Sequence, residues 1–297
     1  MIDRTAAPRD NGAMELFVFI AVLGAAVLHA GWNALVRIGL DRFSLVLMLS
    51  IGQAVLGALL LFVSPLPAAA ALPWLVASAV IHAGYKLFLV QSYRHADLTQ
   101  AYPLARGTAP LIVAVVSLIA LGERLALMEV LAILFISSGI LLMAARGSTG
   151  ADGRGVRMQG RALAFALATA AATASYTLVD GHGARAAGHA GAFVAWMFIG
   201  DAVLISLWAL ATRGPGAFVA LRPALGQGAL VAAMSFGAYA IVVWAFTRAP
   251  IALVAALRET SILFAILIGA FMLGERLTPW RLAAAALIAA GVPLMRL

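Results

Sequence analysis

The sequence predicts an all-α integral membrane protein with ten transmembrane helices, arranged as two inverted five-helix repeats. Three observations predict this fold. Hydrophobic residues make up 64% of the 297 positions and charged residues only 11%, which is more apolar surface than a soluble core can bury. Apolar stretches of about 20 residues, the length that crosses a bilayer, recur along the chain. The sequence Leu-Gly-Glu-Arg-Leu occurs twice, beginning at Leu121 and at Leu273.

Ten apolar segments follow one another with short connections that often contain proline or glycine. The first segment follows a tail, residues 1–14, that contains Arg4 and Arg9. We interpret it as an uncleaved span rather than a signal peptide, because Trp32, Asn33 and Arg37 continue its helical pattern. The expected spans are 15–37, 43–64, 72–93, 98–120, 126–145, 161–180, 190–212, 225–247, 251–272 and 279–296.

The duplication divides the chain into two units. Residues 15–145 are expected to form the first repeat and residues 161–297 the second. The stretch 146–160 between them is rich in glycine and arginine, as flexible linkers are. Outside the signature, Arg106 matches Arg258. Because each unit has an odd number of spans, the second unit enters the membrane upside down relative to the first.

The repeated signature is expected to be architectural. Its glycines, Gly122 and Gly274, are predicted to adopt a left-handed turn at the end of one helix. Its glutamates, Glu123 and Glu275, are predicted to lie in the first turn of the next helix, where a negative charge is favourable.

Composition excludes several classes of protein. Because the chain has no cysteine, it has no disulfides, thiolate metal sites or cysteine nucleophiles. The net charge of +8 is carried mostly by arginines in short loops, which fits lipid headgroups and membrane topology better than nucleic acid. Neither a metal nor a cofactor is expected, since no His-Glu-x-x-His motif occurs. An intramembrane enzyme is therefore a distant alternative.

Three cations lie well inside predicted spans: Lys86, Arg106 and Arg258. Each would cost about 2.5–3.5 kcal/mol at the bilayer centre. We therefore expect them to face a partner or a wet cavity rather than lipid. The acids expected to be available to them are Asp201 and Glu259.

Polar side chains form helical stripes on the first, third, fourth, sixth and eighth segments, and these stripes predict a central chamber lined by both halves. Polar residues between helices also serve as simple packing contacts, and this alternative stays open. Aromatic walls with charges of both signs suit small organic solutes, amino acids above all. The candidates for ion coupling are Asp201, Glu259 and His82. The expected substrate-binding residues are His29, Trp32, Asn33, Ser78, His82, Tyr85, Lys86, Tyr102, Arg106, Tyr176, Ser235, Tyr239, Arg258 and Glu259.

The paired signatures, with the runs Tyr93–Pro110 and Phe246–Ser261, resemble the drug/metabolite transporter superfamily, EamA type, over residues 15–297. The resemblance implies export of amino acids, metabolites or drugs without ATP, along a path between the halves. It extends to the subgroup similar to YddG, which exports amino acids, including aromatic ones. It also implies cytoplasmic termini, whereas the arginine-rich loops opposite the termini predict an external location for them. Both orientations stay open.

The predicted function is that of a monomeric secondary transporter in the cell inner membrane, working by alternating access. The expected partners are an amino acid or metabolite, membrane lipid and a coupling proton, with no nucleic acid. The alternatives are efflux of drugs or organic cations, and a lipid-linked solute flippase of the same fold.

Overall fold

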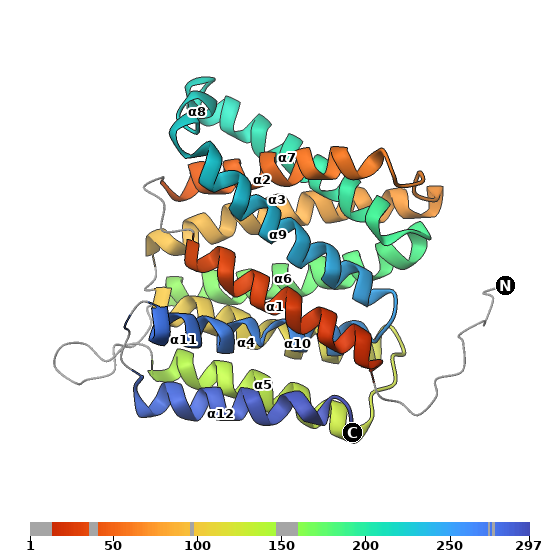
Figure 1. Cartoon of the computed structure of the whole chain (residues 1–297), viewed down its shortest axis with the longest axis vertical. Coiled ribbons are helices and arrows are strands. Elements are labelled where there is room, and N and C mark those ends of the chain that lie inside the picture. The colour runs from red at the N-terminus through yellow and green to blue at the C-terminus, as the bar shows by residue number, and fades with distance from the viewer. Residues whose placement is uncertain (1–13, 36–40, 96–97, 147–159, 273, 275–276) are drawn as a thin grey trace.

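The structure is a computed structural model that describes residues 14–35, 41–95, 98–146, 160–272, 274 and 277–297 (Figure 1). Its regular elements in these ranges are helices that lie side by side along a common direction (Figure 1). The helices are α1 (Leu16–Leu35), α2 (Arg42–Leu61), α3 (Leu72–His95), α4 (Leu98–Ile119), α5 (Leu127–Arg146), α6 (Gly160–Ala187), α7 (Ala190–Arg213), α8 (Gly216–Val219), α9 (Leu225–Phe246), α10 (Ile251–Arg258), α11 (Ser261–Met272) and α12 (Pro279–Leu294), with short 3-10 turns at Ala69–Ala71 and Arg222–Ala224.

The helices have the length and composition of membrane spans. Eight stretches of the described chain are long and apolar enough to cross a bilayer, and 103–119 and 279–294 form shorter apolar helices. Large apolar side chains such as Phe62 and Phe271 point outward and are more than four-fifths exposed, as lipid-facing residues are in a structure without lipid. The expected all-α, multi-pass membrane protein is therefore confirmed.

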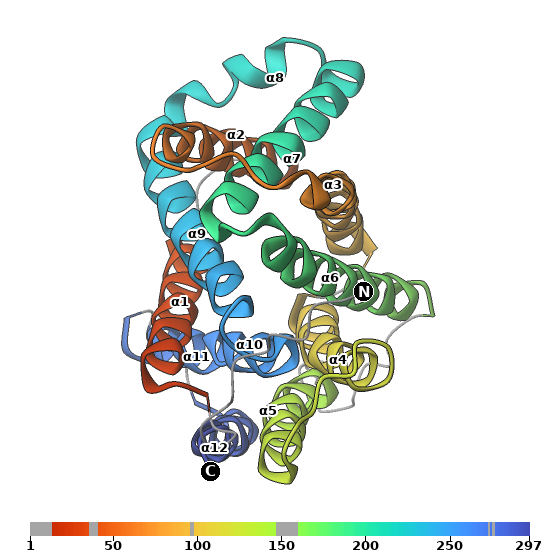
Figure 2. The same ribbon diagram turned by 90° about the vertical axis from the view of Figure 1, so that its right-hand side faces the viewer.

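The helices pack in pairs that cross between the two halves of the chain (Figure 2). Helix α2 packs on α7, and α5 packs on α12. Helix α3 packs on α6 and α7, while α9 packs on α1 and α2. At the α5–α12 crossing, a Cβ on Gly139 would lie 2.8 Å from the Ala284 carbonyl oxygen, and one on Gly291 would lie 2.9 Å from that of Ala132. Glycine at both positions therefore lets these two backbones touch.

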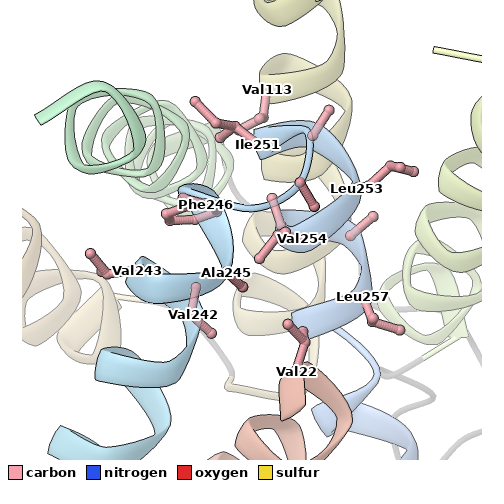
Figure 3. Packing of buried hydrophobic residues seen from close by; sticks show 14 of the residues in the cluster. Val22, Val113, Val242, Val243, Ala245, Phe246, Ile251, Leu253, Val254 and Leu257 are labelled. Carbon is pink, nitrogen blue, oxygen red and sulfur yellow. The ribbon is translucent and has the colours of Figure 1, made fainter. Parts of the chain in front are cut away.

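Helix α10 forms the centre of the apolar core. Every one of its residues is buried, and its side chains pack with the end of α9, with Val22 of α1 and with Val113 of α4 (Figure 3). Because α10 is surrounded by protein on all sides, it can carry a charged residue at its end without presenting that charge to lipid.

The ninth expected span, 251–272, is not one continuous helix. It breaks between Arg258 and Ser261. At the break, the Glu259 and Thr260 amides donate to carbonyls three residues back, at 3.0 and 3.1 Å. The Thr260 hydroxyl also donates to the Leu257 carbonyl at 2.7 Å. These local bonds replace the regular helical ladder, and they turn Glu259 into the protein interior.

For the Leu-Gly-Glu-Arg-Leu signature, the structure confirms the prediction for the glycines and contradicts the prediction for Glu123. Gly122 and Gly274 have φ angles of 63° and 66°, in the left-handed region. The expectation for Glu123 is wrong, because it lies four residues before α5 begins. Its carboxylate instead accepts hydrogen bonds from the Ile251 amide at the start of α10, at 3.1 Å. Glu275 lies outside the described residues.

Candidate functional site

Three buried carboxylates organise the polar interior: Asp180 on α6, Asp201 on α7, and Glu259 at the break between α10 and α11. Each is fully shielded from solvent. A buried carboxylate without partners is costly, so the groups around each one define what the interior can do. We refer to the three carboxylates with their partners as the polar core.

Glu259 joins the two arginines at equivalent positions of the repeat. Its Oε2 lies 2.6 Å from Arg106 Nε, and its Oε1 lies 3.2 Å from an Nη atom of Arg258. Arg106 also donates to the Ser261 hydroxyl at 2.8 Å, and its other Nη lies 3.3 Å from His29 Nε2. One carboxylate thus pairs with two permanent cations from different halves of the chain.

Asp201 is held by Lys86 and Ser50. Lys86 Nζ pairs with the Asp201 carboxylate and donates to the Ser50 hydroxyl at 2.7 Å. Ser50 donates to the same carboxylate at 3.0 Å. Nearby, the Gln53 amide donates to the Ser235 hydroxyl at 3.0 Å. This cluster connects α2, α3, α7 and α9.

Asp180 has partners of a different kind. It accepts hydrogen bonds from the hydroxyls of Ser78 and Tyr239, and His82 Nε2 lies 2.8 Å from its Oδ2. Among the ion pairs of the described residues, His82 is its only basic partner. Asp180 therefore ties α3 and α9 to α6, and its basic partner is a histidine rather than a lysine or an arginine.

Aromatic rings connect these clusters. The Tyr176 ring lies 4.4 Å from the His82 ring, 5.4 Å from that of Tyr85 and 6.2 Å from that of Tyr239, measured between centroids. The Arg258 guanidinium lies 5.9 Å from the Tyr176 centroid, on the ring face. Tyr176 therefore contacts both the Glu259 cluster and the Asp180 cluster.

The predicted site residues fall into three groups. Trp32 lies at the edge, where its ring meets His29 at 5.1 Å, and the Asn33 amide bonds within its own helix, to the His29 carbonyl at 2.8 Å. The side chain of Tyr102 lies outside the described residues. The structure brings the others together in the polar core: His29, Ser78, His82, Tyr85, Lys86, Arg106, Tyr176, Asp201, Ser235, Tyr239, Arg258 and Glu259.

Sequence reasoning did not include Asp180 among the site residues. The sixth span was expected to end at residue 180, whereas α6 continues to Ala187. Asp180 is therefore inside a helix and not at its end. Asp180 follows Tyr176, a predicted site residue, by four positions, so the two side chains lie on the same side of the helix. This spacing could have identified Asp180 as a site residue.

A polar core enclosed by apolar helices is typical of membrane transporters of small solutes. Comparison with known families names the class more closely: residues 160–297 match the EamA-like transporter family. The match confirms the resemblance to the EamA type of the drug/metabolite transporter superfamily for the second half of the chain, which is an EamA-type unit. The protein is therefore a multi-pass membrane transporter of small solutes.

Two further comparisons concern the whole chain. No curated protein matches the sequence. A protein known from a crystal structure is similar in fold over 94% of this chain and 94% of its own, with a TM-score of 0.70 and 17% sequence identity. At that identity the similarity establishes a shared fold and nothing about the solute.

Proposed function

We propose that the protein is a secondary exporter of amino acids, including aromatic ones, that moves its solute through the polar core by alternating access. The observation that carries the proposal is the core itself, where charges of both signs and three tyrosines meet between helices of both halves. This combination matches an ammonium, a carboxylate and an apolar side chain.

Helix packing supports two inverted repeats, 15–145 and 161–297, as the moving parts. The contacts of α3 with α6 and α7 have counterparts in the contacts of α9 with α1 and α2. Gly139 and Gly291 occupy the α5–α12 crossing reciprocally, and they are separated by the same interval as the two signatures. Two units related by a pseudo-twofold axis in the membrane plane would pack in this way.

Two buried polar atoms support a zwitterionic solute. Arg258 Nε and Asp201 Oδ1 have no hydrogen-bond partner among the described residues. Buried groups of this kind normally find a partner. A carboxylate can accept a hydrogen bond from Arg258 Nε, and an ammonium can donate one to Asp201 Oδ1. A solute with only one charge would leave one of these two atoms unmatched.

The test is counterflow in proteoliposomes with a panel of amino acids, their decarboxylated amines and organic cations. We expect exchange of amino acids and little exchange of the amines. Arg258→Lys keeps a cation beside Glu259 but removes the planar guanidinium, so it should raise the half-saturating concentration. Arg222→Lys, in the 3-10 turn just before α9, is the control, because Arg222 is exposed. Exchange of organic cations alone would favour drug efflux instead, and no exchange of any solute would contradict the proposal.

The structure also supports a choice among the groups proposed for proton coupling. Asp201 is paired with Lys86, and Glu259 is paired with two arginines. The basic partner of Asp180 is a histidine. Asp180 faces Ser78 and His82 from α3, Tyr239 from α9 and Tyr176 from its own helix, with Arg258 beyond Tyr176. We infer that His82 and Asp180 together carry the coupling proton.

Proton binding at this pair would neutralise Asp180 and weaken the bonds that tie α3 and α9 to α6. Flux measured with and without a pH gradient tests this step. We expect the gradient to drive net flux, and we expect Asp180→Asn to remove that drive while exchange without a gradient persists. If wild-type flux does not respond to the pH gradient, proton coupling is contradicted and the protein is a facilitator.

A further inference from the structure

A cavity lies at one end of the helix bundle, outside the polar core. It occupies about 590 Å³ where the end of α6, the start of α7 and the end of α9 meet. Its lining includes Arg185, His189, Trp244, Thr247 and Arg248. We refer to the space defined by these residues as the α6–α9 vestibule.

The vestibule has two guanidinium groups. Arg185 is held in place, since its Nε donates to the Phe246 carbonyl at 2.8 Å and one Nη donates to the Ala249 carbonyl and to Glu123. Its other Nη has no partner among the described residues. The Arg248 guanidinium lies 5.7 Å from the Trp244 ring centroid, and no described ion pair neutralises it. The local charge is therefore positive beside an aromatic ring.

The start of α7, which forms another side of the vestibule, adds a hydrogen-bond donor. His189 Nδ1 accepts a hydrogen bond from the Ala192 amide at 3.2 Å and so caps the first turn of α7. This contact fixes a neutral ring as the tautomer with its proton on Nε2, so the other side of the ring is a donor. The start of α7, a helix of 24 residues, contributes a partial positive charge.

The floor of the vestibule adjoins the polar core. Ala184, which lines the cavity, follows Asp180 by one turn of α6, and Ala240 follows Tyr239 directly on α9. The Asp180–Tyr239 hydrogen bond joins these two helices just below the floor. A solute released from that end of the core would therefore pass through the vestibule.

We propose that the α6–α9 vestibule is an anion site that binds a carboxylate attached to an aromatic or apolar body. Arg185, Arg248 and the His189 Nε2 proton hold the oxygen atoms, and the Trp244 ring packs against the body. The proposal rests on the proposed transport function for its ligand, the carboxylate of the transported solute. A lipid phosphate has the same oxygen chemistry and is the competing source.

The test is equilibrium binding to the full-length protein in phosphatidylcholine nanodiscs. The probe is 3-phenylpropionate, and its uncharged amide serves as the comparison. We expect the carboxylate to bind and the amide not to bind. Arg248→Gln should weaken carboxylate binding by about tenfold, the effect of losing one charge-assisted contact. Arg248→Lys should restore part of the affinity, because it keeps the charge.

The matched control is Arg222→Gln, which removes an exposed arginine from the 3-10 turn that precedes α9, at the opposite end of that helix from the vestibule. It should leave the affinity unchanged. Thermal unfolding of each variant shows whether it is folded. Equal binding by the wild type and Arg248→Gln, or no carboxylate binding at all, overturns the solute site. Stabilisation by phosphatidylglycerol that Arg248→Gln removes, without carboxylate binding, assigns the anion site to lipid phosphate and overturns the solute as its ligand.

Binding and transport can fail separately. Probe binding without counterflow of any solute would overturn the transport proposal alone. Counterflow that persists while no probe binds would overturn the vestibule alone.

Discussion

The Glu259 cluster and the Asp180 cluster meet at Tyr176, and each buries a carboxylate completely. Glu259 has two arginines as partners, which stay charged at any pH that the protein tolerates. Asp180 has two hydroxyls and a histidine. The first cluster therefore has a fixed charge and suits a structural joint. The second has a histidine and two hydroxyls in place of arginines, and we propose it as the moving contact.

A similar asymmetry separates the two copies of the repeat. Arg106 is followed by Gly107 in the continuous helix α4, whereas Arg258 is followed by Glu259 at the break after α10. A Cβ on Gly107 would lie 2.9 Å from Leu141 Cγ of α5, so close helix packing takes the place of a charged group there. The duplicated arginines share one acid because only the second copy supplies it.

The largest effect is expected from Glu259→Gln. The change removes the buried carboxylate that pairs with both Arg106 and Arg258 and should destabilise the protein by about 3–5 kcal/mol. Thermal unfolding in detergent and the yield of folded protein measure the loss. Glu123→Gln, at the end of the bundle, is the control and should cost far less. Similar losses for both variants would contradict the role of Glu259 as the joint between the halves.

The next effect concerns Lys86→Ala, which removes the cation from buried Asp201. The yield of folded protein should fall, since the carboxylate is left without its charge partner. Lys86→Ala combined with Asp201→Asn should recover part of that yield, because the unpaired charge is gone. If the single and double variants have equal unfolding temperatures, the unpaired Asp201 carboxylate is not the cause of the loss.

Asp180→Asn should change mainly the response of flux to a pH gradient. The amide keeps a hydrogen-bonding group near Ser78 and Tyr239, so we expect a stability loss of about 1–3 kcal/mol. Gradient-driven flux should be lost while exchange continues. Asp201→Asn provides the contrast, since the flux that remains in it should still respond to the gradient. If the flux of Asp180→Asn still responds to the pH gradient, Asp180 is not the coupling site.

Tyr85→Ala tests the aromatic wall with a smaller change. Loss of its edge contact with Tyr176 should cost about 0.5–1.5 kcal/mol and should reduce flux severalfold because the solute loses a wall. Phe88→Ala removes an exposed aromatic ring from the same helix and is the control. Equal kinetics in the two variants would show that Tyr85 is not on the path.

The smallest effect is expected at Asp41, a half-exposed carboxylate at the start of α2. Burial raises the pKa of Asp41, but hydrogen bonds from Ser44 and Arg213 outweigh it, and the net pKa is lowered. A lowered pKa stabilises the fold above the unfolded value of about 3.9, and that stability is lost as the pH falls through the folded value. Asp41→Asn should keep the helix cap and cost about 0.2–1 kcal/mol near neutral pH.

The unfolding temperatures of the wild type and Asp41→Asn should therefore converge in acid. A difference that stays constant down to pH 3 would show that the Arg213 and Ser44 contacts do not depend on the charge.

Much of the fold follows from composition and periodicity. Apolar stretches of span length predicted the helices, and the signature glycines predicted the turns at residues 122 and 274. The break at Glu259 and Thr260 was not predictable in this way, because the stretch is uniformly apolar on both sides. It depends on a side-chain-to-backbone bond and on the packing of α10 by protein on every side.

The cost of burying charge predicted that Lys86, Arg106 and Arg258 would find partners. It did not predict which acid each cation pairs with. Arg258 is the sequence neighbour of Glu259, but Arg106 reaches the same carboxylate from helix α4, and the sequence does not reveal that contact. Asp180 was missed as a site residue although it shares the polar stripe of the sixth span with Tyr176. Trp32 and Asn33 share the helical stripe of His29, but the Asn33 amide turns back to its own backbone.

The most direct test of a solute path through the polar core uses the absence of cysteine from the chain. Ser235→Cys would place a single small thiol in the core, and Val203→Cys would place one on an exposed apolar position of α7. Thiols react with membrane-impermeant reagents only where water reaches them. We predict that the thiol at position 235 reacts from both sides of proteoliposomes and that transported amino acids slow the reaction. A thiol at position 235 that is as inert as the one at position 203, with or without solute, would contradict the path.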